Sequence, residues 1–117
     1  MSKTIATENA PAAIGPYVQG VDLGSMVITS GQIPVDPKTG AVAEDVSAQA
    51  RQSLENVKAI VEAAGLKVGD IVKTTVFVKD LNDFRDRQRH LRSLLHRAQR
   101  HLPGAFPAWK LPVCRKT

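Results

Sequence analysis

The residues that could do chemistry near the start of the chain are a serine, a glycine and a tyrosine. Ser30 is the last residue of a β-branched apolar run at residues 26–30, and Gly31 follows it. A serine hydroxyl beside an exposed backbone amide can bind a carboxylate or a polarised C=N group. Tyr17 adds a phenol hydroxyl, which finds a hydrogen-bond partner when it is buried, whatever the function. A Ser-Gly pair is also an ordinary strand end, so these residues alone leave the function open.

A second group of reactive side chains lies in the last third of the chain: His90, His96, His101 and Cys114. Zinc sites need three or four convergent ligands, and only His90 and His101 share a helical face. No upstream group at a recognisable spacing would orient a pair formed by Cys114 and a histidine. We therefore expect no metal site and no cysteine nucleophile, and the sequence has no glycine-rich phosphate loop.

Short strands and one long helix must position Ser30 and Tyr17. Extended stretches are predicted at residues 17–20 and 26–30, and Pro and Gly within residues 34–40 indicate a hairpin or a broad loop. The alternating segment 71–78 is predicted to be a central strand.

A helix of about five turns is predicted to begin at Asp45 and to end before Gly65, because apolar residues recur there at helical spacing. The stripe consists of Ala50, Leu54, Val57, Val61 and Ala64. With a second helical region after residue 84, the order predicts an α+β fold with a single sheet and helices packed on one face. The length fits one domain over residues 1–117.

Charge is divided unevenly along the chain, which has 117 residues and a net charge of +5. Residues 1–84 hold seven basic and ten acidic residues, a net charge of −3, whereas residues 85–117 hold nine basic residues and one acidic residue, a net charge of +8. The basic character is therefore a property of the last 33 residues alone.

The sequence predicts a cytoplasmic protein. A single cysteine excludes an intramolecular disulfide framework. The first residues lack the apolar stretch of a secretory signal, and no run approaches the ~18 apolar residues of a membrane span. We therefore expect no membrane partner.

Four segments of the chain closely resemble the RidA (YjgF) family, and the resemblance runs from residue 1 to residue 84. The segments are residues 10–20, 28–34, 50–58 and 72–78. The resemblance implies a chorismate-mutase-like α+β subunit that assembles as a homotrimer, with active clefts between subunits.

The resemblance also implies an enzyme that needs no cofactor. Members of the family hydrolyse enamines and imines such as 2-aminoacrylate and 2-aminocrotonate, which pyridoxal-phosphate-dependent threonine and serine dehydratases release, to 2-oxo acids and ammonia. In the family the cleft is lined by residues that correspond to Tyr17, Ser30 and Gly31. An Arg from a Phe-Pro-Ala-Arg-Ser segment and a Glu from the last strand supply the charge chemistry, and neither segment is present after residue 84. Trp109, which takes the Arg place in a chance likeness of that segment, is given no role.

The departure after Phe84 has the form of a shifted reading frame. Family members continue approximately as Ala-Thr-Val-Asn-Ala-Thr-Tyr-Glu-Ala-Phe-Phe-Thr. One synonymous codon set for that stretch, read one nucleotide out of frame, gives residues 85–96 without a mismatch. We therefore interpret residues 85–117 as a frameshifted reading, by sequencing error or by mutation. A chain that truly carries them is expected to lack its last strand, to fold badly and to have little or no activity.

The alternative is that residues 85–102 are a basic amphipathic helix. Leucines fall on one face of this segment and arginines on the other, a pattern typical of helices that bind RNA or acidic surfaces. Because the frameshift accounts for the basic residues, we favour the imine deaminase and expect no nucleic-acid partner.

Overall fold

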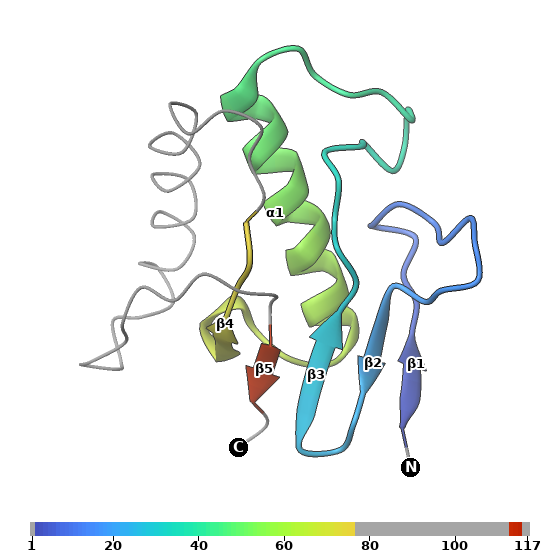
Figure 1. Cartoon of the computed structure of the whole chain (residues 1–117), viewed down its shortest axis with the longest axis vertical. Helices are drawn as coiled ribbons and strands as arrows, with labels where there is room; N and C mark the ends of the chain where they lie inside the picture. Colours follow the sequence, from blue (N-terminus) through green and yellow to red (C-terminus); the bar gives the residue numbers. More distant parts are fainter. Residues whose placement is uncertain (1, 77–112, 116–117) are drawn as a thin grey trace.

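One antiparallel sheet and a long helix make up the part of the chain that the computed structural model describes, residues 2–76 and 113–115. The strands are ordered β1-β2-β3-β5-β4 (Figure 1). They are Lys3–Ile5 (β1), Gly20–Asp22 (β2), Met26–Thr29 (β3), Ile71–Lys73 (β4) and Val113–Arg115 (β5). Helix α1, Val46–Ala63, packs on one face of the sheet, and the 3-10 helix η1, Val68–Asp70, leads into β4. The predicted α+β class is confirmed.

Helix α1 begins and ends where its capping residues stand. Asp45 is the N-cap, and its Oδ2 accepts a hydrogen bond from the Ala48 amide at 3.1 Å. At the other end Gly65 has a φ of 79°, and the Leu66 amide donates to the Val61 carbonyl at 3.1 Å. This left-handed glycine and the six-to-one bond form a Schellman ending. The predicted helix is confirmed at both ends.

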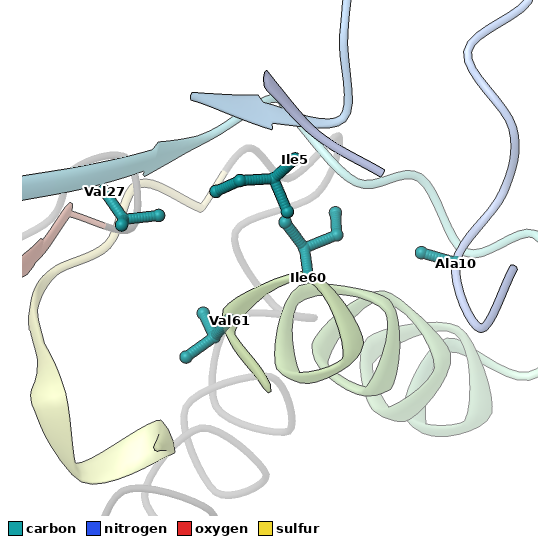
Figure 2. Close-up of a cluster of buried hydrophobic side chains, with 5 residues drawn as sticks. All are labelled: Ile5, Ala10, Val27, Ile60 and Val61. Carbon is teal, nitrogen blue, oxygen red and sulfur yellow. The ribbon is translucent and has the colours of Figure 1, made fainter. Parts of the chain in front are cut away.

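The core lies between α1 and the sheet. Val27 of β3 and Ile5 of β1 point toward Ile60 and Val61 of α1, with Ala10 at the edge of the cluster (Figure 2). The predicted apolar stripe is only partly correct, because the fully buried positions on α1 include Ile60 and Asn56, whereas Val57 and Ala64 are partly buried.

The predicted first strand starts three residues too early. Residues 17–19 are not a strand, because the Tyr17 amide donates to the Gly15 carbonyl at 2.8 Å in a tight turn, and the ladder begins where Gly20 pairs with Thr29. Gly20 also lies close to α1. A Cβ at this position would lie 3.0 Å from Ile60 Cγ2, so a larger residue would push the helix away.

The predicted strand at residues 71–78 is confirmed in part, by β4 at its start. Among the described strands β4 stands last in the sheet order, and residues 77 and 78 lie outside the described residues, so its predicted central place stays a prediction. β5 occupies the position between β3 and β4, with Cys114 paired to Val27 on one side and to Ile71 on the other. Without it, both strands would present unpaired backbone groups. The expectation that the chain lacks its last strand is therefore wrong, while the helical segment expected at 85–102 lies outside the described residues.

Candidate functional site

Ser30 stands directly after β3, and its hydroxyl is fixed by the neighbouring chain. Its amide donates to the Gln19 carbonyl at 2.9 Å, and its Oγ donates to the same carbonyl at 3.0 Å. A carbonyl oxygen has two lone pairs, so this one oxygen accepts both bonds. The pairing continues the β2–β3 register by one residue, and it joins the end of the segment that contains Tyr17 to the residue before Gly31.

Gln19 is itself held by its side chain, which is almost fully buried at 5% exposure. Its Oε1 accepts from the Thr7 amide at 2.6 Å, and its Nε2 donates to the carbonyls of Thr7, Ala10 and Pro11 at 3.0, 3.1 and 2.8 Å. One amide therefore fixes the loop between β1 and β2 to the start of β2. Buried amides that find all their partners rigidify the chain around them.

Gly31 and Gln32 form the exposed side of the site. Gly31 is exposed, and a Cβ built on it would meet nothing within 4 Å. Gln32 folds back over this turn, where its Nε2 lies 3.3 Å from Ser30 O, Ser30 Oγ and Gly31 O. Three contacts of this length for two N–H groups are weak. The space beside the Gly31 backbone is therefore open to a small molecule.

Asn56 of α1 fixes the loop that continues from this turn. The side chain is fully buried, and its Nδ2 donates to the carbonyls of Ile33 and Val35 at 3.1 and 3.0 Å. Its Oδ1 accepts from Gln52 Nε2 at 2.9 Å. Val35 also forms an isolated antiparallel bridge with Val42, as the prediction of a hairpin or broad loop at 34–40 allows.

Tyr17 lies in an exposed loop and is not joined to Ser30 by a hydrogen bond. Its side chain is 52% exposed, and Ile14, three residues earlier, is 93% exposed. The structure therefore brings Ser30 and Gly31 together and leaves the Tyr17 phenol at the surface, two residues before the Gln19 to which Ser30 is bonded. Sequence reasoning missed Gln19 and Asn56. The signal for Asn56 was a polar residue four positions before Ile60 on the buried face of a helix; for Gln19 we find no local signal.

Residues 2–76 and 113–115 contain no candidate metal cluster. No group of three or more histidine, cysteine, aspartate or glutamate side chains occurs there that could hold an ion. His90, His96 and His101 lie outside these residues, as does Trp109. Within the same ranges, no helix is long and apolar enough to cross a membrane.

A hollow of about 450 Å³ lies away from Ser30 and Gly31. It is formed between the loop after β1 and the outer face of α1, and its lining includes Thr7, Asn9, Glu55, Lys58 and Glu62. None of the predicted site residues lines this hollow, and of the two, Gly31 is exposed and Ser30 is partly buried.

A family model described as Endoribonuclease L-PSP matches residues 7–113 of the chain. The chain belongs to this family. The predicted membership of the RidA (YjgF) family is confirmed by the relatives as well. The chain is 90% identical over 84 residues to the 2-iminobutanoate/2-iminopropanoate deaminase of Escherichia coli K12, an alignment that covers 72% of this chain and 66% of that protein. It is 74% identical over 84 residues to the reactive intermediate deaminase TdcF of the same organism, covering 72% of this chain and 65% of that one.

Solved structures of the family extend the likeness beyond those 84 residues. The crystal structure of E. coli TdcF with bound serine superimposes with a TM-score of 0.89 at 48% identity, and covers 98% of this chain and 99% of the other. The YjgF gene product of E. coli superimposes with a TM-score of 0.85 at 60% identity, with the same coverage. The sequence match to the curated relatives spans just under two thirds of their length. The alignments of high sequence identity are thus 84 residues long, whereas the structural superpositions cover nearly the whole chain.

Proposed function

We propose that the chain is an imine deaminase of the RidA type, which hydrolyses 2-iminobutanoate, 2-iminopropanoate and their enamine precursors. Water adds to the C=N carbon, the carbinolamine loses ammonia, and a 2-oxo acid remains. The observation that carries the proposal is the 90% identity, over 84 residues, to a protein named for this activity. No cofactor takes part in the proposed reaction.

The open turn after β3 suits this chemistry. Gly31 presents backbone to solvent with nothing within 4 Å of where a side chain would stand, so a substrate carboxylate can approach the amide closely. Ser30 supplies a fixed hydroxyl next to it. Tyr17 would close over the substrate from the exposed loop before β2, because its ring is already half in solvent.

A homotrimer would complete the site. Met26 and Val72 are 37% and 58% exposed apolar residues on strands β3 and β4, and Ile14 and Ile33 are exposed in the loops near Ser30. Burying such residues against a second copy removes apolar surface from water. We propose that the sheet faces inward in a trimer and that each cleft is formed between two subunits.

The substrate is expected to come from pyridoxal-phosphate-dependent threonine or serine dehydratases in the cytoplasm. Such enzymes release enamines that tautomerise to imines, and both are short-lived in water. A hydrolase for them need not bind its substrate tightly to be useful.

The chain as printed lacks the Arg and the Glu that the resemblance requires. A planar guanidinium would hold the substrate carboxylate, and a carboxylate would position the attacking water. We propose that residues 85–117 arise from a shifted frame and that the chain carrying them turns over substrate slowly.

The test compares two proteins made from one gene. One carries the 117 residues as printed, and the other has the frame restored after Phe84. Ammonia release from freshly generated 2-aminoacrylate should be at least about 100-fold faster in the frame-restored protein, because a positioned acid or base alone contributes on that scale. Equal rates in the two proteins would contradict the assigned roles, and a rate no faster than in buffer without protein, for both, would overturn the deaminase. Steeply salt-dependent RNA binding by the printed chain in place of activity would support the basic-helix alternative.

A further inference from the structure

The hydroxyl of Ser30 has a fixed polarity. Its single proton is donated to the Gln19 carbonyl at 3.0 Å. A hydroxyl that has given its proton to one partner can offer only lone pairs to the next. We propose that Ser30 acts as a hydrogen-bond acceptor that recognises the N–H end of the substrate, and that it does not donate to the substrate carboxylate. This inference rests on the proposed function in one respect, the class of ligand.

The Gln19 carbonyl is held in place, so its hydrogen bond from Ser30 Oγ is not easily broken. It already accepts the Ser30 amide at 2.9 Å, which fixes the distance between the two residues. The Gln19 side chain is held by the Thr7 amide and by three carbonyls, and it is 5% exposed. Since residue 19 is held on both its main chain and its side chain, the acceptor for the Ser30 proton stays in place when a ligand arrives.

The lone pairs of Ser30 Oγ have one weak competitor among the described residues. Gln32 Nε2 lies 3.3 Å away, and it shares its two N–H groups with the carbonyl oxygens of Ser30 and Gly31 at the same distance. Good N–H···O bonds are about 0.3–0.4 Å shorter. A substrate N–H can therefore displace the Gln32 amide, or use the second lone pair beside it.

A hydrogen-bond acceptor at Ser30 would distinguish the substrate of the proposed reaction from its product. An imine nitrogen carries one N–H and its protonated iminium form carries two, whereas carboxylate and keto oxygens carry none. The lone pairs of Ser30 Oγ would repel a carboxylate, but they would stabilise an iminium. Water attacks the carbon of an iminium more readily than that of a neutral imine. The product 2-oxo acid lacks the N–H, so it loses this contact and leaves more easily.

Two ligands that differ only at this position test the proposal with the 117-residue chain. 2-Aminobutanoate carries an ammonium and 2-oxobutanoate carries a keto oxygen, and both carry the same carboxylate and ethyl group. A substitution that acts on the group at C2 therefore changes the ratio of their dissociation constants, whereas one that acts on the carboxylate changes both constants. Both constants would be measured from NMR shifts of the Gly31 amide at millimolar ligand.

Three variants complete the design. Ser30→Ala should raise the dissociation constant of 2-aminobutanoate about tenfold, since a hydrogen bond from a charged donor is lost. The dissociation constant of 2-oxobutanoate should change by less than about twofold. Ser30→Thr keeps the hydroxyl and should keep the ratio. Ser25→Ala makes the same chemical change at the other end of β3, in an exposed residue, and should change neither constant.

The outcomes separate the two proposals. If Ser30→Ala weakens both ligands equally, or 2-oxobutanoate more, the hydroxyl is a donor and the inference is wrong. If the unaltered chain binds neither ligand, the inference is also wrong, because no such site exists. Should the ratio behave as expected while neither protein in the ammonia assay shows turnover, the nitrogen-recognising site stands and the deaminase proposal fails.

Discussion

The first 84 residues and the last 33 differ in every property that the sequence records. The first region has a net charge of −3 and contains the four segments that resemble the family. The second has a net charge of +8, and the alignments with the E. coli relatives are 84 residues long, 72% of this chain. Even so, the family model extends to residue 113, and β5 lies inside the sheet, between β3 and β4. Membership of the family and possession of the Arg and Glu that the resemblance requires are therefore separate properties of this chain.

Under the proposed function, the site is divided between the two regions. Residues 2–76 hold the neutral half, in which backbone groups and buried amides fix Ser30 and Gly31. The charged half that the resemblance requires belongs to residues after 84, where the expected Arg and Glu are missing. A sheet can accept almost any extended segment as a partner, because ladder bonds use the backbone. Catalysis cannot accept such substitutions, because it depends on particular side chains.

Removing β5 tests most severely whether the second region belongs to the fold. A chain that ends at residue 112 leaves both β3 and β4 without the partner that now lies between them. We expect the free energy of unfolding to fall by about 3–5 kcal/mol, from several lost ladder bonds at ~1 kcal/mol each. Urea denaturation followed by circular dichroism measures this. The control removes only residues 116–117, and an equal stability of all three chains would show that residues 113–115 contribute nothing.

Asn56 offers a test confined to the first region. Asn56→Leu removes the donors to the Ile33 and Val35 carbonyls from a fully buried position, and should cost about 2–3 kcal/mol of unfolding free energy. Gln52→Ala is the matched control, because it removes only the bond to Asn56 Oδ1 and leaves the loop fixed. Because this network lies wholly in the shared region, the loss should be the same in the printed and the frame-restored chains. A loss in only one of them would mean that the two regions are coupled through α1.

Local patterns predicted the elements of the first region well. The spacing of apolar residues and the residues Asp45 and Gly65 located α1, and the run at residues 26–30 located β3. The side-chain hydrogen bonds of Gln19 and Asn56 were not predictable in the same way. Gln19 binds carbonyls 8 to 12 residues earlier and Asn56 binds carbonyls more than 20 residues earlier. Such contacts depend on how loops fold back, and no periodicity encodes that. The pairing of β4 depends on β5, which lies 40 residues later in the sequence, for the same reason.

Substitution of Gln19 should lower the free energy of unfolding less than substitution of Asn56 does. It should disturb the loop between β1 and β2 more. Gln19→Met keeps the length of the side chain and leaves the Thr7, Ala10 and Pro11 groups without their partner, at an expected cost of about 2 kcal/mol. Hydrogen exchange of the Thr7 amide should rise strongly, since it loses its acceptor. The matched control is Gln49→Met, whose bond to the Ala43 carbonyl holds a different loop. Unchanged hydrogen exchange of the Thr7 amide would show that the hydrogen bonds of the Gln19 side chain do not order this loop.

The smallest effect is expected at the start of α1. Asp45→Ala removes the acceptor for the Ala48 amide and should lower the unfolding free energy by about 1 kcal/mol. Glu44→Ala is the control one residue earlier, since Glu44 is exposed and is not the N-cap. Both residues are acidic and both precede the helix, so an effect of charge near the helix end would appear in the two variants alike. A loss confined to Asp45→Ala, and equal in the printed and frame-restored chains, would show that α1 carries its own start signal. In that case the first region forms its helix whatever sequence follows Phe84, and only the groups that act on substrate depend on the reading frame.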